Sequence, residues 1–216
     1  MTRPYAFFIP LSLTALLLTG CAQPAPEEGP VPVSSEEEML AVYETYSSLL
    51  FGDMTVLADG QAETWWIPDF QSKDFSYEYA YLDLDQDGQP ELLVQMKEEP
   101  GGYNGVFHYE NGKLVCWQSD GTEMSSQEYP LEDGTMVSQY DSNGTCSYTL
   151  FSYLPDGQRK ELSHLFLRRE RIPEDSTEPC PYYEIDGKEV DQDVFEERLK
   201  SLITDRLLDR SGWTWV

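Results

Sequence analysis

The chain has 216 residues and a formal net charge of −26, with 40 Asp and Glu against 14 Lys and Arg. This charge argues against nucleic acid as a partner, because phosphate binding requires clustered Lys and Arg. It also opposes electrostatic attachment to anionic lipid head groups. The length suits one ordinary domain, or two small ones at most.

Residues 1–20 have the pattern of a cleavable export signal. Arg3 is followed by an apolar run from 6 to 19, which is shorter than the roughly 20 residues that a membrane-spanning helix needs. Pro10 inside the run also argues against a permanent span. We therefore expect these residues to be removed by the general export pathway.

The run ends in Leu18-Thr19-Gly20-Cys21, which resembles the lipobox of bacterial lipoproteins. The resemblance implies cleavage after Gly20 and a lipid on Cys21 that holds the protein on the extracytoplasmic face of the cell membrane. The alternative is an ordinary secretory signal followed by a chance cysteine. Since the chain is acidic, the acyl chains alone would provide the membrane attachment.

Residues 21–33 contain four prolines and no periodic apolar pattern, which is typical of a solvated tether. A helix is predicted from about Ser35 to Phe51, with a serine cap at its start and Gly52 at its end. Residues 34–216 are expected to form a single extracytoplasmic domain.

The middle of the chain changes to short, near-alternating runs separated by Asn-Gly and Asp-Gly turns. These runs predict strands at 75–82, 91–96, 105–109, 113–118, 135–140, 145–154 and 158–169, with a short strand and turn at 182–190. The fold class is therefore α+β, an antiparallel meander of roughly six to eight strands packed by an N-terminal and a C-terminal helix.

The C-terminal helix is expected to start at Asp191 or Asp193 and to end at Gly212. Its predicted buried face consists of Phe195, Leu199, Leu202, Ile203 and Leu207. The last four residues, 213–216, alternate aromatic side chains and are expected either to return to the sheet as an edge or to tuck under a helix.

Three cysteines follow the proposed lipidation site, so at least one of them lacks a partner within the chain. Cys116 and Cys146 both lie in strand-like runs and are the candidates for a disulfide between neighbouring strands.

The most specific motif of the domain runs from Asp83 to Glu91 as Asp-Leu-Asp-Gln-Asp-Gly-Gln-Pro-Glu. Hard cations such as Ca²⁺ take six to eight oxygen ligands, several of them anionic, and a glycine allows the sharp turn between them. The predicted metal ligands are Asp83, Asp85, Asp87, the carbonyl of Gln89, and Glu91.

This motif resembles the first nine positions of an EF-hand loop, but Val94 replaces the closing glutamate and the flanks are strand-like. It is closer to the strand-loop-strand calcium loops of FG-GAP-type repeats. With the segment Tyr183–Val190, it also resembles uncharacterised lipoproteins of Gram-positive gut bacteria, a group that implies no activity. We expect a structural calcium ion. The alternative is an acidic loop that binds nothing tightly.

Other catalytic patterns are weak. The two histidines, His108 and His164, have no zinc spacing, and no nucleophile motif is present. The five tryptophans could form a platform for sugar or peptide, but packing in the core and on the sheet faces is the favoured explanation. We therefore expect a non-enzymatic binding or interaction module with an envelope protein or glycan as ligand. The alternative is a small cell-wall or glycan hydrolase that uses paired carboxylates.

Overall fold

The computed structural model describes residues 35–98, 102–121, 125–170, 177 and 179–216. The predicted signal peptide, Cys21 and the tether at 21–33 lie outside the described residues. Among the described residues, no helix is long and apolar enough to cross a membrane.

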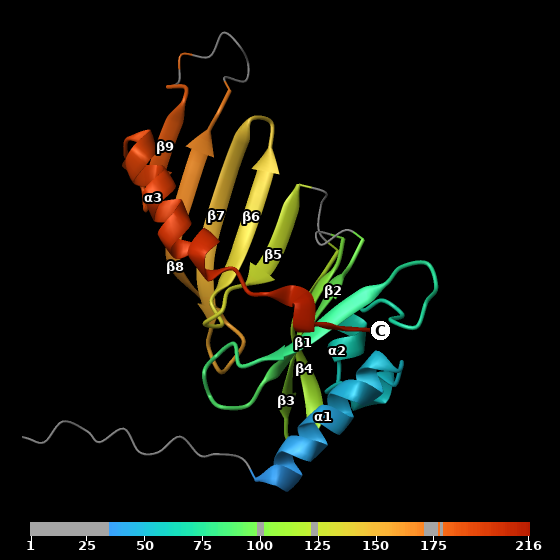
Figure 1. The fold of residues 1–216 in the computed structure, drawn as a ribbon. Helices are drawn as coiled ribbons and strands as arrows, with labels where there is room; N and C mark the ends of the chain where they lie inside the picture. Colours follow the sequence, from blue (N-terminus) through green and yellow to red (C-terminus); the bar gives the residue numbers. More distant parts are fainter. Residues whose placement is uncertain (1–34, 99–101, 122–124, 171–176, 178) are drawn as a thin grey trace, which may run out of the picture. The chain divides into compact units, whose positions relative to one another are not determined.

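Eleven strands form two antiparallel sheets in the described part of the chain (Figure 1). The first sheet has the order β11-β1-β2-β3-β4 and the second has the order β10-β9-β8-β7-β6-β5. The first contains β1 (Tyr77–Leu82), β2 (Glu91–Met96), β3 (Asn104–Glu110), β4 (Lys113–Asp120) and β11 (Thr214–Trp215). The second contains β5 (Ser126–Pro130), β6 (Met136–Ser142), β7 (Thr145–Tyr153), β8 (Arg159–Arg168), β9 (Tyr182–Ile185) and β10 (Lys188–Glu189).

The predicted α+β class is confirmed, with α1 (Glu36–Leu50) near the start of the domain and α3 (Gln192–Leu202) near its end. The strands outnumber the predicted six to eight because β5, β10 and β11 add to the predicted ones, and together they form two sheets. β5 has no predicted counterpart, since its sequence has no clear alternation and ends in Pro130. The C-terminal residues return as the edge strand β11, which pairs with β1.

Helix α1 begins where the capping pattern places it. Ser35 Oγ accepts a hydrogen bond from the Glu38 N–H, and the Glu38 carboxylate accepts one from the Ser35 N–H. Val42, Tyr46, Leu49 and Leu50 are buried on the face that packs against the first sheet. This face forms one core with Leu92, Val94, Phe107 and Leu114 of β2, β3 and β4.

Helix α3 corrects two predictions. It ends at Leu202 rather than at Gly212, and short 3₁₀ turns follow at Thr204–Arg206 and Arg210–Gly212. Phe195 and Ile203 are buried against the second sheet, whereas Leu207 is half exposed and lies beyond the helix. The residues after 202 no longer follow the α-helix, so the apolar residues spaced along them belong to a connecting segment.

The connecting segments include a short 3₁₀ turn, η1 (Met54–Val56), and a four-residue helix, α2 (Gln61–Thr64).

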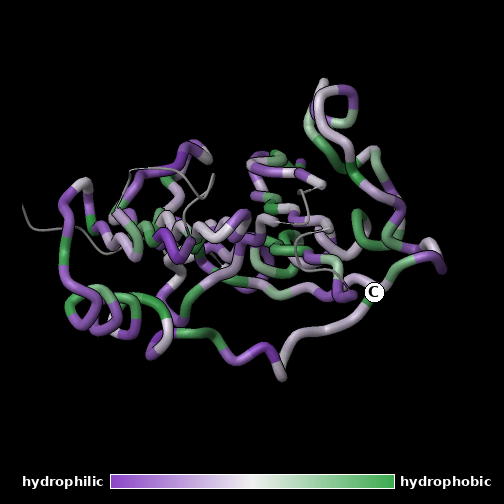
Figure 2. The backbone as a smooth tube through the Cα atoms, turned by 90° about the horizontal axis from the view of Figure 1, so that it is seen from above, coloured by the Kyte–Doolittle hydropathy of each residue, from purple (hydrophilic) through white to green (hydrophobic). Residues whose placement is uncertain are grey.

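A third apolar cluster joins the two sheets through Leu93 and Val106 of the first and Met136 and Phe151 of the second. Hydrophobic and hydrophilic residues alternate at short intervals along much of the chain, as expected for strands with one buried face (Figure 2).

The proposed disulfide is not formed. Cys116 lies in β4 of the first sheet and Cys146 lies in β7 of the second, so the two strands are not neighbours, and both thiols are free. Cys116 instead donates a hydrogen bond to the carbonyl of Gln118 at 3.2 Å, and burial raises the pKa of its thiol to about 12.

Candidate metal centre

The Asp-rich loop joins β1 to β2. Leu82 of β1 pairs with Glu91 of β2, so residues 83–90 form the connection. Gly88 adopts the left-handed backbone that the motif predicts, with φ of 92°. Gln86 also has a positive φ, 64°, which is uncommon for a residue other than glycine and shows how tightly the loop turns.

The three aspartates hold the loop together through backbone donors. Asp83 Oδ2 accepts from the Gly88 N–H at 3.1 Å. Asp85 Oδ1 accepts from the Asp87 N–H at 3.2 Å, and Asp87 Oδ1 accepts from the Gln89 N–H at 2.7 Å. With this folding, one carboxylate oxygen from each aspartate lies within 4.8 Å of the other two. The structure thus brings together the three carboxylates that the spacing singles out.

The ends of the loop are fixed to the rest of the domain. Leu84 is buried in the cluster between the sheets, and the Tyr46 hydroxyl of α1 donates to the Pro90 carbonyl at 2.9 Å. The Gln89 side-chain amide donates to the Tyr109 carbonyl at 2.7 Å. Gln89 therefore anchors the loop through its side chain, while the role of its backbone carbonyl as a ligand stays a prediction.

Glu91 is fully buried at the start of β2. Its Oε2 accepts from the Leu84 N–H at 2.7 Å, and its Oε1 lies 2.9 Å from Nδ1 of His108 on β3. Desolvation raises the pKa of Glu91 to about 7, although its hydrogen bonds with His108 and Leu84 oppose the shift. Desolvation lowers the pKa of His108, but the hydrogen bond and the charge of Glu91 outweigh it, so the net pKa is raised.

Asp85 links the exposed carboxylates to this buried pair. Donor atoms of Asp85, Glu91 and His108 also lie within 4.8 Å of one another. Asp85 Oδ2 is buried and has no hydrogen-bond partner in the described part of the structure. Burial, followed by the charge of Asp87, raises the pKa of Asp85. A buried carboxylate oxygen without a partner is costly, and a cation would supply one.

The donor set fits a hard cation at the aspartates. Asp83, Asp85 and Asp87 provide only oxygen, which suits Ca²⁺ better than metals that prefer nitrogen or sulfur. Glu91 faces inward toward His108. It is therefore either a further ligand of the ion or a residue that orients the aspartate ligands from outside the ligand set. The nitrogen of His108 allows a second possibility, a zinc-like ion held by Asp85, Glu91 and His108.

His108 is the functional candidate that the sequence did not reveal. Its partner Glu91 lies 17 positions away, and only the β2–β3 register brings the two together. No local signal gives this contact: the Asn111-Gly112 turn that follows fixes the register of β3 against β4, where His108 lies opposite Val115, and not against β2. The predicted disulfide pair, Cys116 and Cys146, contributes nothing to this site.

Comparison with known proteins returns no match of any kind: no family model, no curated protein and no solved structure resembles the chain significantly.

Proposed function

We propose that this chain is an extracytoplasmic lipoprotein, anchored through Cys21, whose domain is a binding module stabilised by calcium at the Asp83–Glu91 loop. The observation that carries the calcium part is the buried, unpartnered Oδ2 of Asp85 beside two further carboxylates. An ion at this position would neutralise the aspartates and fix the β1–β2 hairpin. Extracellular calcium is abundant, so weak affinity is sufficient.

The calcium test is thermal unfolding of the purified chain with a chelator or with added Ca²⁺. At a calcium concentration a hundredfold above Kd, binding adds about 2.7 kcal/mol. For a domain of this size, that raises the Tm by about 5–10 °C. Parallel measurements with Mg²⁺ and Zn²⁺ separate an all-oxygen site from one that uses His108.

Asp85→Asn should abolish this shift while keeping the size of the side chain. Asp156→Asn is the matched control, because Asp156 also accepts from a backbone N–H two residues on, the Gln158 N–H at 3.0 Å, in a different hairpin loop. A wild-type Tm that stays unchanged at millimolar calcium, or an equal shift in both variants, would refute the calcium site.

The anchor has a separate test. In a bacterial host, the wild-type chain should fractionate with membranes and Cys21→Ser should not, because the acyl chains require the thiol. Recovery of both chains in the same fraction would show that Cys21 is not the anchor.

The binding role is favoured over the hydrolase by the state of a carboxylate pair that lines a cleft. Asp120 and Glu128 line one cleft, but both oxygens of Glu128 accept N–H groups of Arg159, at 2.9 and 3.0 Å. A carboxylate held in this way is poorly placed to donate a proton to a glycosidic oxygen.

A further inference from the structure

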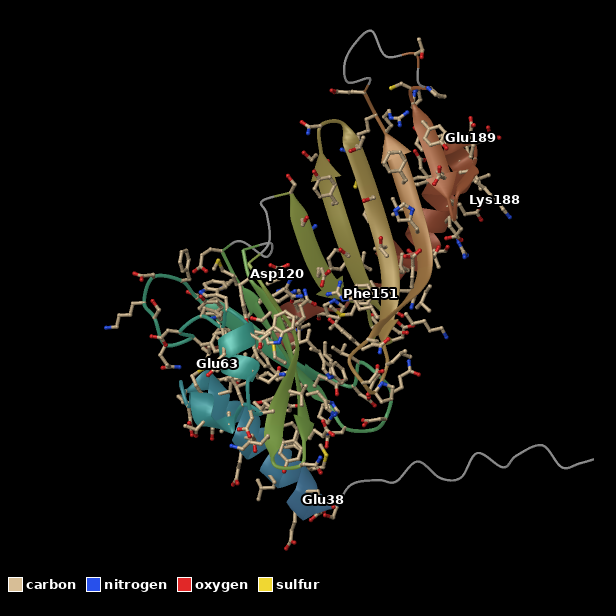
Figure 3. The ribbon with its side chains drawn as sticks, turned by 180° about the vertical axis from the view of Figure 1, so that it is seen from behind. Glu38, Glu63, Asp120, Phe151, Lys188 and Glu189 are labelled. Carbon is tan, nitrogen blue, oxygen red and sulfur yellow. The ribbon has the colours of Figure 1, made fainter. Side chains whose placement is uncertain are left out.

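A cleft of about 870 Å³ lies where β4 of the first sheet meets β5, β6 and β8 of the second. This volume is within the range of roughly 300–1,000 Å³ that small-molecule sites occupy. The sheets are joined there by hydrogen bonds, including one from the Gln95 amide of β2 to the Glu128 carbonyl of β5. Figure 3 labels Asp120 of β4, which lines the cleft, and Phe151 of β7.

One side of the cleft is a rigid polar cluster. Arg159 binds both carboxylate oxygens of Glu128 and also donates to Oε1 of Gln118, which accepts a second hydrogen bond from the Tyr153 hydroxyl at 2.8 Å. The guanidinium also lies over the ring of Phe151, at 4.4 Å from its centroid. Gln118 and Glu128 are both only 7 % exposed. A buried polar cluster whose hydrogen bonds are satisfied fixes the positions of its side chains, so this wall of the cleft is preorganised.

Two indoles provide apolar surface in the same cleft. Trp117 is immobilised and largely covered: its ring centroid lies 4.6 Å from that of His108, which stacks on it, and 5.2 Å from that of Tyr153, and a Cβ at Gly157 would lie only 2.4 Å from the indole. Gly157, at φ of 76°, is therefore required by the turn and by the approach of Trp117. Trp65 is partly exposed and offers the second surface.

The charges of the cleft disfavour an anionic ligand. Glu128 neutralises Arg159, which leaves Asp120 to repel an anion. The remaining polar groups include the hydroxyls of Ser126 and Ser138, which both donate and accept hydrogen bonds.

We propose that this cleft binds an uncharged saccharide. A sugar ring presents C–H groups that pack on an indole and hydroxyl groups that both donate and accept, which matches the two kinds of surface found here. The proposal rests on the binding-module role proposed above and names the ligand class of that module.

The test is isothermal titration calorimetry of the full chain, in a detergent without sugar, against uncharged tetrasaccharides. The probes are β-1,4-linked glucose, N-acetylglucosamine and xylose, with an uncharged Ala-Ser pentapeptide as the competing class. We expect at least one saccharide to bind with a Kd of about 1 mM or tighter, and the peptide not to bind.

Two variants locate the binding. Ser138→Trp fills the cleft from a partly exposed position, and Trp65→Ala removes an indole; each should weaken the saccharide at least about tenfold. Trp215→Ala is the matched control, because Trp215 is 59 % exposed on β11 and does not line the cleft. It should bind as the wild type does.

Three results would overturn the proposal: no saccharide bound at about 1 mM, the peptide bound in preference, or unchanged affinity in both cleft variants. The Tm of every variant, with and without calcium, is measured on the same samples. An intact calcium shift with no saccharide binding removes this proposal alone, whereas a missing wild-type shift removes the calcium site.

Discussion

The β1–β2 hairpin closes differently from the β3–β4 and β6–β7 hairpins, and the difference points to the site. The β3–β4 and β6–β7 hairpins turn in two residues, Asn111-Gly112 and Asn143-Gly144, and all four have a positive φ. The β1–β2 hairpin uses residues 83–90 and brings three carboxylates together. The β5–β6 and β7–β8 connections, 131–135 and 154–158, are also longer than two residues, so the carboxylate cluster rather than length alone distinguishes the β1–β2 loop.

The largest expected effect on stability comes from Glu91, which is buried at the end of the β1–β2 loop. Glu91→Ala leaves the Leu84 N–H and His108 without their buried acceptor, which should lower the free energy of unfolding by about 3 kcal/mol. Glu189→Ala on the exposed strand β10 should change it by less than about 0.5 kcal/mol. Urea unfolding at pH 7 measures both, and equal values would show that Glu91 is not a structural anchor of the loop.

The pH dependence of stability gives a second way to distinguish Glu91 from exposed carboxylates. In the calcium-free chain, Glu91 stays protonated when folded up to a pKa of about 7, but it ionises near 4.5 when unfolded. Its contribution to stability is therefore complete below pH 4.5 and is lost as the pH rises to about 7. Relative to Glu91→Gln, the wild type should lose up to about 3 kcal/mol over this range. A constant difference between the two chains would contradict the raised pKa.

Substitution of the turn glycines should have a smaller effect, which can be compared between two hairpins. Alanine at Gly88 or at Gly112 must adopt a φ of 92° or 82°, which costs about 1 kcal/mol in each case. Thermal unfolding should therefore show similar losses of stability without calcium. Only Gly88→Ala should also weaken the calcium shift, because only that turn brings carboxylates together. Equal calcium responses would mean that the loop geometry does not matter for the ion.

Local signals in the sequence predicted much of this structure. The serine cap of α1, the bounds of β2 and the Asn-Gly turns all follow from a few neighbouring residues, and so do the three aspartates and Gly88. The features that the sequence did not predict depend on contacts between residues far apart in the chain. The division into two sheets, the Glu91–His108 contact and the polar cluster around Arg159 are all set by register and by sheet packing. The disulfide prediction failed for the same reason.

The smallest effect connects the loop to the cleft. Glu91 binds His108, His108 stacks on Trp117, and Trp117 lines the cleft, so an ion that fixes Glu91 also fixes one wall of the saccharide site. Calcium should then strengthen saccharide binding about twofold to fivefold, a coupling of roughly 1 kcal/mol or less. Titrations with calcium and with a chelator measure it, and His108→Ala should remove the difference while leaving the calcium shift in place. Saccharide affinity that is the same with and without calcium would show that the two sites act independently.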